Sequence, residues 1–92
     1  VCLGYPFHPL GKPDQLRVDH LRTLKTPCLI LQGERDPMGK REEVLSYSLS
    51  EKIEIQWMTD GDHSFKPRKA SGWTVEQNWL EAAKHVGRFL LS

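Results

Sequence analysis

The sequence predicts an α/β fold built on a parallel sheet. Segments at residues 1–4, 27–33 and 53–58 have the composition of short strands, and they alternate with loop and helical segments. The segment 27–33 is an apolar run that ends at a glycine, which is typical of a parallel strand covered on both faces. A strong helical pattern follows at 74–90. Alternating strands and helices favour a parallel sheet with helices packed against it.

The shorter elements have weaker local signals. Residues 5–14 contain three prolines and a glycine, which predicts a rigid loop. The apolar spacing in residues 15–24 is loosely helical, and residues 40–48 are expected to form a short helix after a turn. Residues 53–58 alternate with period two, which places Ile53, Ile55 and Trp57 on one face of a strand near the sheet edge.

The last helix is marked both at its start and along its length. Thr74 and Gln77 match a capping box, in which the threonine side chain accepts from the backbone amide three residues later. Apolar residues then recur at three- and four-residue steps and form a stripe that needs a sheet or helix to lie on. The stripe consists of Val75, Trp79, Ala82, Ala83, Val86, Phe89 and Leu90. We therefore expect Trp79, like Trp57, to pack in the core.

Composition excludes several classes of protein. The 92 residues carry a formal charge of +1, so bulk charge does not favour a nucleic-acid partner. The longest apolar run, residues 28–31, is far below the ~20 residues needed to cross a bilayer. Cys2 and Cys28 lie in strand-like runs, where buried reduced thiols are expected, and this favours a cytoplasmic location.

Polar side chains follow two of the predicted strands. Asp36 lies in the turn after the buried strand, and His63 lies in the loop after residues 53–58. The carboxyl ends of parallel strands meet at one edge of the sheet, so the two side chains are expected to form a hydrogen bond. A carboxylate that holds a histidine in one tautomer prepares it to act as a general base. Gly33 and Gly61, which come shortly before Asp36 and His63, are expected to permit the sharp backbone turns that point these side chains over the sheet edge.

Residues 27–37, Pro-Cys-Leu-Ile-Leu-Gln-Gly-Glu-Arg-Asp-Pro, and residues 61–65, Gly-Asp-His-Ser-Phe, resemble the acid and histidine motifs of α/β-hydrolases. The resemblance covers nearly the whole chain. It implies the C-terminal part of that fold, with three mostly parallel strands, flanking helices and a long C-terminal helix. Residues 1–6 are similar to the strand that follows the nucleophile-bearing helix in small dienelactone-hydrolase-like members.

The resemblance implies catalytic roles for Asp36 and His63 in a Ser-Asp-His triad that acts on a small carboxylic ester or related acyl compound, without cofactor or metal. No serine here lies in a Gly-x-Ser-x-Gly elbow, which precedes the acid and histidine in this family. We therefore expect residues 1–92 to be one partial domain, inactive alone, with the nucleophile half upstream of Val1. The missing starting methionine agrees with this interpretation.

Other interpretations of the whole chain remain open. The complete protein could be a non-catalytic hydrolase-like scaffold that binds a protein partner, or the chain could be a free-standing small binding domain. In a partial domain one sheet edge lacks its neighbour, and such an edge recruits partners. Self-association or pairing with an upstream segment is therefore expected at that edge.

Three further features have both a functional and an ordinary interpretation. His8 follows the first strand and is a candidate substrate-pocket residue, although a packed loop histidine is the more common case. Asp60, Asp62 and His63 could bind a hard metal ion, but metal sites usually recruit ligands from additional elements. A basic cluster beside Phe65, at residues 66–69, could meet an anionic substrate, although a solvated loop is the simpler interpretation.

Overall fold

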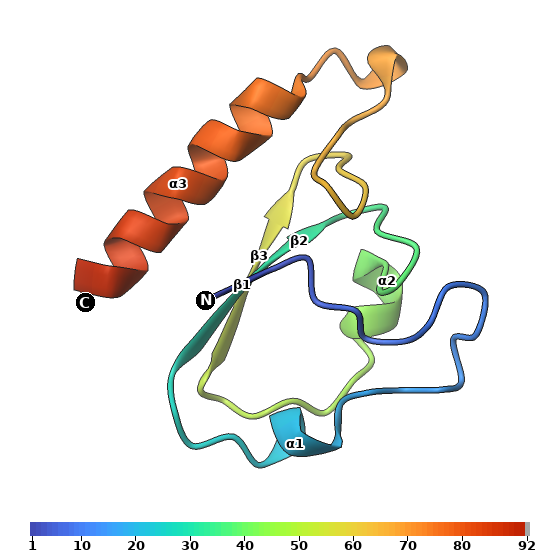
Figure 1. Ribbon diagram of the computed structural model, residues 1–92, viewed down its shortest axis with the longest axis vertical. Coiled ribbons are helices and arrows are strands. Elements are labelled where there is room, and N and C mark those ends of the chain that lie inside the picture. The colour runs from blue at the N-terminus through green and yellow to red at the C-terminus, as the bar shows by residue number, and fades with distance from the viewer. Residues whose placement is uncertain (92) are drawn as a thin grey trace.

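The computed structural model describes residues 1–91 and has the predicted α/β fold (Figure 1). Over these residues the sheet contains the parallel strands β1 (Cys2–Leu3), β2 (Cys28–Gly33) and β3 (Ile53–Met58), with β2 in the centre. The helices are α1 (Asp19–Arg22), α2 (Arg41–Val44), the 3-10 helix η1 (Lys69–Ser71) and α3 (Val75–Leu91). The sheet lies between α3 on one side and α1 and α2 on the other.

The central strand β2 explains why residues 28–33 are almost continuously apolar. Leu29 and Leu31 face α3, where they pack with Met58, Phe65 and Ala82. Ile30 faces the opposite way, into a cluster with Phe7, Val18, Leu21 and Val44. Because both faces of the strand are covered, residues 29–33 are buried, and Cys28 at its start is half-buried.

The sequence predicted β3 and its edge position correctly. Ile53, Ile55 and Trp57 all pack against the cluster around Ile30, as the period-two alternation required. Trp57 also has the Arg41 guanidinium 5.9 Å from its ring centroid. The other face of the strand carries Glu54, which pairs with Arg88 of α3 at 2.5 Å.

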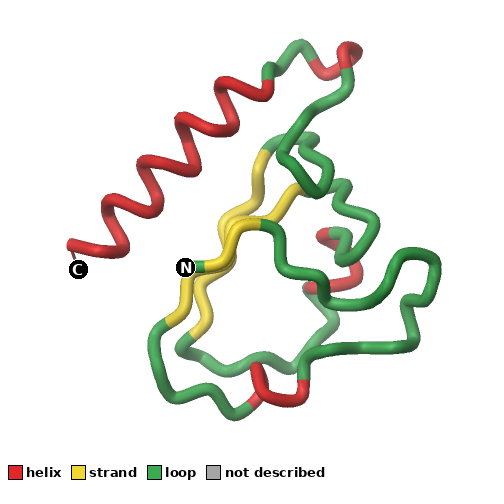
Figure 2. The backbone as a smooth tube through the Cα atoms, in the orientation of Figure 1, coloured by secondary structure: helices red, strands yellow, loops and turns green. Residues whose placement is uncertain are grey.

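The predicted helical turn within residues 15–24 forms as α1, and the predicted helix at 40–48 forms as the shorter α2. Arg17 N donates to Phe7 O over 2.7 Å, so residues 15–17 stay with the preceding loop and α1 begins at Asp19. The Ser46 hydroxyl donates to Glu43 O over 2.5 Å, close to where α2 ends. Figure 2 shows that most of the chain between β1 and β2 is loop.

Helix α3 begins with the predicted capping box. Gln77 N donates to Thr74 Oγ1 over 3.2 Å, and Thr74 N donates to Gln77 Oε1 over 2.8 Å. Ala82 is buried, and Val86 and Phe89 pack against the cluster on that face of the sheet. The expectation that Trp79 lies in the core was wrong, because the residue is 56% exposed.

The structure also bears on the expectations for membrane-spanning segments and for the two cysteines. No helix within residues 1–91 combines the length and the apolar character needed to cross a membrane. Cys2 and Cys28 are unpaired and half-buried. Burial raises the pKa of the Cys2 thiol, and the nearby Cys28 adds to the shift, so Cys2 is poorly suited to act as a nucleophile.

Candidate active site

The loops that follow β2 and β3 lie against each other at one end of the sheet. Glu34 N donates to Met58 O over 3.2 Å, and Arg35 N donates to Gly61 O over 2.8 Å. These backbone bonds continue the β2–β3 pairing beyond the strands. They bring together the two residues that the sequence placed at neighbouring strand ends.

Asp36 and His63 form a short hydrogen bond. Asp36 Oδ2 lies 2.6 Å from His63 Nδ1, and the two residues are separated by 27 positions in the sequence. The Asp36 side chain is fully buried, whereas the His63 side chain is 45% exposed. Since a carboxylate can only accept, Nδ1 carries a proton in this contact, and the corresponding neutral tautomer has Nε2 as its acceptor. A histidine in this state can take a proton from a neighbouring hydroxyl group.

The Asp36 carboxylate has further donors beneath the histidine. Gln32 Nε2 donates to the same oxygen, Oδ2, over 3.1 Å. Met38 N donates to Oδ1 over 2.9 Å. A buried carboxylate needs such donors to remain ionised. The acid is therefore held from the strand below it and from the turn that follows it.

Gly33 allows the two loops to approach each other. A Cβ atom at residue 33 would lie 2.1 Å from Asp62 O and 2.4 Å from Gly61 O, so a side chain has no room there. The expected turns are present, since Asp36 N donates to Gly33 O over 3.1 Å and Gly61 N donates to Met58 O over 3.0 Å, but neither glycine has a positive φ. Gly4 does have φ +73°, and a Cβ atom there would lie 2.9 Å from His63 O. The glycines serve close packing of backbone around His63.

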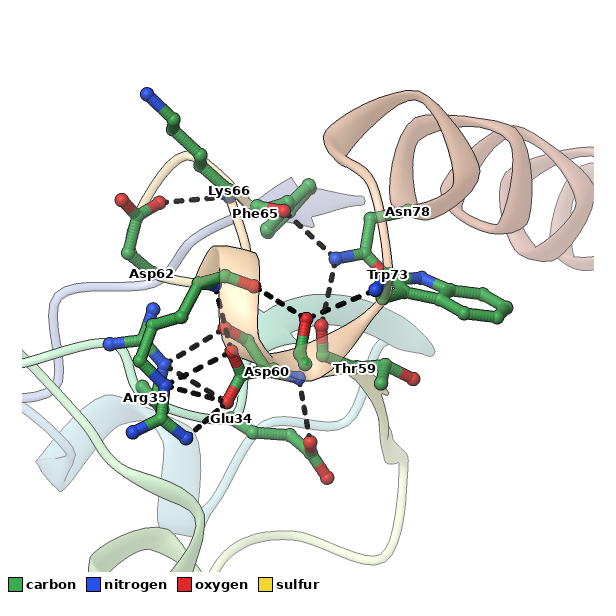
Figure 3. Close-up of polar contacts among 11 residues, drawn as sticks. Glu34, Arg35, Thr59, Asp60, Asp62, Phe65, Lys66, Trp73 and Asn78 are labelled. Carbon is green, nitrogen blue, oxygen red and sulfur yellow. Dashed lines mark hydrogen bonds and ion pairs between the residues drawn. The ribbon is translucent and has the colours of Figure 1, made fainter.

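The loop that carries His63 is held by ion pairs at its base (Figure 3). Asp60 Oδ1 lies 2.7 Å from Arg68 Nη2 and 3.2 Å from Arg35 Nε. The Arg68 hydrogen bonds lower the pKa of the Asp60 carboxyl to about 2. Asp60 N also donates to Glu34 Oε1 over 2.8 Å. Arg35 and Glu34 come from the acid loop, so this network ties the two loops together.

A buried amide closes the same loop from the other side. Asn78 of α3 is 1% exposed, and its Nδ2 donates to Thr59 O over 3.0 Å and to Phe65 O over 2.8 Å. Its Oδ1 accepts from Trp73 Nε1 over 2.9 Å. Figure 3 shows Asn78 reaching from α3 toward Thr59 and Phe65. Asp60 and Phe65 have φ of +52° and +68°, which is strained for residues with a side chain.

His8 lies in the loop after β1 and is 2% exposed. Its Nδ1 lies 2.8 Å from Pro9 O, and its Nε2 lies 3.2 Å from Glu43 Oε1. Burial alone would lower the His8 pKa, but these hydrogen bonds and the charges of Glu43 and Asp36 outweigh it and raise the pKa. His8 borders a cavity of about 410 Å³ near Pro37 and Lys40. Its role as a substrate-pocket residue stays a prediction.

Several side chains of the metal and anion interpretations, namely Asp60, His63 and Arg68, already have partners within the structure. Asp60 is bound by arginines, and Asp62 Oδ1 accepts from the backbone amides of Ser64 and Lys66. Within the described chain, no group of three or more His, Cys, Asp and Glu residues is arranged to hold a metal ion. Arg68 belongs to the Asp60 network, so its charge is balanced within the loop.

His63 also borders an apolar groove between β1 and α3. The groove has a volume of about 780 Å³. It is lined by Leu3, His63, Ser64, Phe65, Trp79, Ala82, Ala83, Val86 and Gly87. Leu3 and Trp79 are 62% and 56% exposed. This side of the sheet therefore presents uncovered apolar surface next to the histidine.

Comparison with known proteins decides the family. The family model described as an alpha/beta hydrolase domain matches residues 1–91. The chain belongs to the α/β-hydrolase family. Among the solved structures, none matches this α/β-hydrolase chain. The strand order and the positions of Asp36 and His63 after neighbouring strands agree with the C-terminal part of that fold.

Sequence reasoning missed two buried amides of this α/β-hydrolase chain. Gln32 had a weak signal, because it is the polar residue in an otherwise apolar strand. Asn78 also had one, since it shares the four-residue spacing of Ala82 and Val86 on α3. A polar residue on a buried face usually has a hydrogen-bonding task, and both residues bind the loops that carry the candidate site.

Proposed function

We propose that this chain supplies the acid and the histidine of a Ser-Asp-His triad in a serine-type α/β-hydrolase. The observation that carries the proposal is the 2.6 Å contact of a fully buried Asp36 carboxylate with a half-exposed His63. The substrates are small carboxylic esters or related acyl compounds, and no cofactor takes part. The dienelactone-hydrolase-like subtype and a cytoplasmic location belong to the same proposal.

In the proposed reaction, His63 Nε2 takes the proton from the serine hydroxyl as the oxygen attacks the ester carbonyl carbon. Asp36 holds the ring through Nδ1–H and stabilises the imidazolium that forms. The tetrahedral intermediate expels the alcohol, which receives its proton from Nε2. Water then repeats the sequence on the acyl-serine and releases the acid. Backbone amides on the upstream segment stabilise the oxyanion.

The nucleophile half is proposed to bind along the edge of β1 and the groove beside α3. Both features lie next to His63, and the groove offers apolar surface of the kind that a docking segment covers. On its own, the 92-residue chain is expected to be inactive and to self-associate through the same surface.

A second candidate function is a non-catalytic scaffold that binds a protein partner. The absence of Gly-x-Ser-x-Gly from the sequence and the uncovered groove favour it. The two candidates differ in one respect: a working hydrolase needs an activated nucleophile in the complete protein, whereas a scaffold does not.

The test is His63→Ala in the complete protein, assayed with a short-chain ester and with a fluorophosphonate probe. We expect ester turnover to fall by about four orders of magnitude or more, because the general base is lost. His85→Ala is the matched control and retains turnover. Equal turnover in His63→Ala and wild type would exclude the catalytic role, and a complete protein that neither turns over ester nor takes the label would favour the scaffold.

A further inference from the structure

We propose that Gln32 is a positioning residue for the acid: its amide holds the Asp36 carboxylate toward His63 and keeps it ionised. The proposal rests on the proposed function of the Asp36–His63 pair and deepens it. Gln32 Nε2 lies 3.1 Å from Asp36 Oδ2, the same oxygen that lies 2.6 Å from His63 Nδ1. Gln32 therefore acts on the atom that orients the histidine.

The orientation of the Gln32 amide is fixed by its neighbours. Tyr5 N donates to Gln32 Oε1 over 2.8 Å, which identifies the oxygen end because a backbone N–H needs an acceptor. The Nε2 end also lies 3.1 Å from Tyr5 O and 3.2 Å from Gly39 O. A flipped amide would place its oxygen against these carbonyls and against Asp36. The nitrogen end of the amide, not the oxygen, therefore faces the acid, which shares the two N–H donors with the Tyr5 and Gly39 carbonyls.

Burial makes this contact important for the charge of Asp36. Both side chains are fully buried, and a buried carboxylate that lacks donors takes up a proton instead. Gln32 and Met38 N supply those donors. Because the amide is neutral, it stabilises the anion without cancelling its charge. An arginine or lysine at residue 32 would also stabilise the anion, but it would weaken the field that Asp36 exerts on His63.

Gln56 provides a matched comparison on the neighbouring strand. Its Nε2 donates to the Glu54 carboxylate over 2.8 Å, so a glutamine–carboxylate contact of the same type lies outside the candidate site. Gln32→Met and Gln56→Met each remove one such contact while keeping side-chain length. Only Gln32→Met removes a donor from the carboxylate that binds His63, and it also removes the contacts of the buried amide with Tyr5 and Gly39.

The experiment follows the Asp36 side-chain carboxyl by carbon NMR during a pH titration of the complete protein. His63 and His8 are titratable groups that face Asp36, so their ring signals are followed in the same samples. We expect the Asp36 midpoint to rise by about one pH unit or more in Gln32→Met, because the ionised form loses a donor. In Gln56→Met we expect no change. Equal Asp36 midpoints in wild type and Gln32→Met would overturn the proposal.

A second measurement needs no substitution and decides the matter if Gln32→Met does not fold. In the wild-type chain, the Gln32 side-chain NH₂ proton shifts should move with the Asp36 midpoint, while those of Gln56 should follow Glu54. Flat Gln32 shifts through the Asp36 titration would contradict the proposal. Neither measurement depends on ester turnover, so a failure of the proposed catalytic function would be recognised separately, in the His63→Ala assay.

Discussion

The two loops of the candidate site are held in different ways. The acid loop is fixed from within the core, since Asp36 is fully buried and binds Gln32 of the central strand. The histidine loop is fixed around its rim, by the Asp60–Arg68 ion pair and by Asn78, while the His63 side chain is 45% exposed. The acid is therefore part of the structure that folds. The histidine is attached to that structure and stays accessible to a reacting group.

This difference predicts that replacing Asp36 with alanine destabilises the fold more than replacing His63 with alanine. Asp36→Ala leaves the Met38 amide without its acceptor, removes one of the three acceptors of Gln32 Nε2 and empties a fully buried position, and we expect a loss of about 3–5 kcal/mol in the free energy of unfolding. His63→Ala removes a half-exposed ring, and we expect a loss of about 1 kcal/mol. Urea unfolding of both variants measures the two values, and equal losses would remove the distinction between the loops.

The close contact of the two loops at Gly33 can be tested in the same way. Gly33→Ala places a methyl group where backbone oxygens of the histidine loop now lie, 2.1 Å from Asp62 O, and we expect a loss of about 2–3 kcal/mol as the loops separate. Gly87→Ala is the control on α3, where a Cβ atom meets nothing within 4 Å. It should stabilise the chain by up to about 1 kcal/mol. Thermal unfolding of both variants checks the opposite signs.

Asn78 tests whether the histidine loop can be loosened independently of the acid. Asn78→Ala removes the donor to Thr59 O and Phe65 O and the acceptor of Trp73 Nε1, and we expect a loss of about 2 kcal/mol. Hydrogen exchange should accelerate at residues 59–66. The Met38 amide, which donates to Asp36, should keep its protection. Faster exchange at Met38 as well would mean that the two loops open together.

The smallest expected effect is on how the stability of the fold depends on pH, to which His8 and Asp60 contribute in opposite directions. The raised His8 pKa means that His8, beside the acid loop, stabilises the fold below its ordinary value of 6.5 and loses this contribution as pH rises through the folded pKa. The Asp60 pKa of about 2 lies below the ordinary 3.8, so Asp60 contributes above that value and loses its contribution as pH falls toward 2. Melting temperatures are measured against pH. In His8→Gln the decrease above pH 6.5 that is due to His8 should disappear, and in Asp60→Asn the decrease below pH 3.8 that is due to Asp60 should disappear.

The sequence predicted those parts of the molecule whose signal is local. The period-two alternation located β3, the apolar run located β2, and Thr74 with Gln77 located the start of α3. The Asp36–His63 contact was also predictable, because parallel strands bring their carboxyl ends to one edge. The catalytic role of that pair stays a prediction.

The parts that could not be predicted depend on contacts between distant segments. Gln32 meets Tyr5 across 27 positions, and Asn78 meets Thr59 across 19, so neither partner is visible in the local pattern. The need for a glycine at residue 33 could not be predicted either, because it arises from the close approach of Asp62 O, which lies 29 positions away in the sequence. Trp79 has core-like spacing on α3, but the groove beside it is uncovered in this structure.

The exposed Trp79 gives the chain an optical signal of its own. Trp79 lines the groove beside His63, and the residue is 56% exposed, so its fluorescence emission should be that of a largely hydrated indole. Any segment that fills the groove removes this water and shifts the emission to shorter wavelength. Binding of a segment in the groove can therefore be followed by tryptophan fluorescence, without an added label or a substrate.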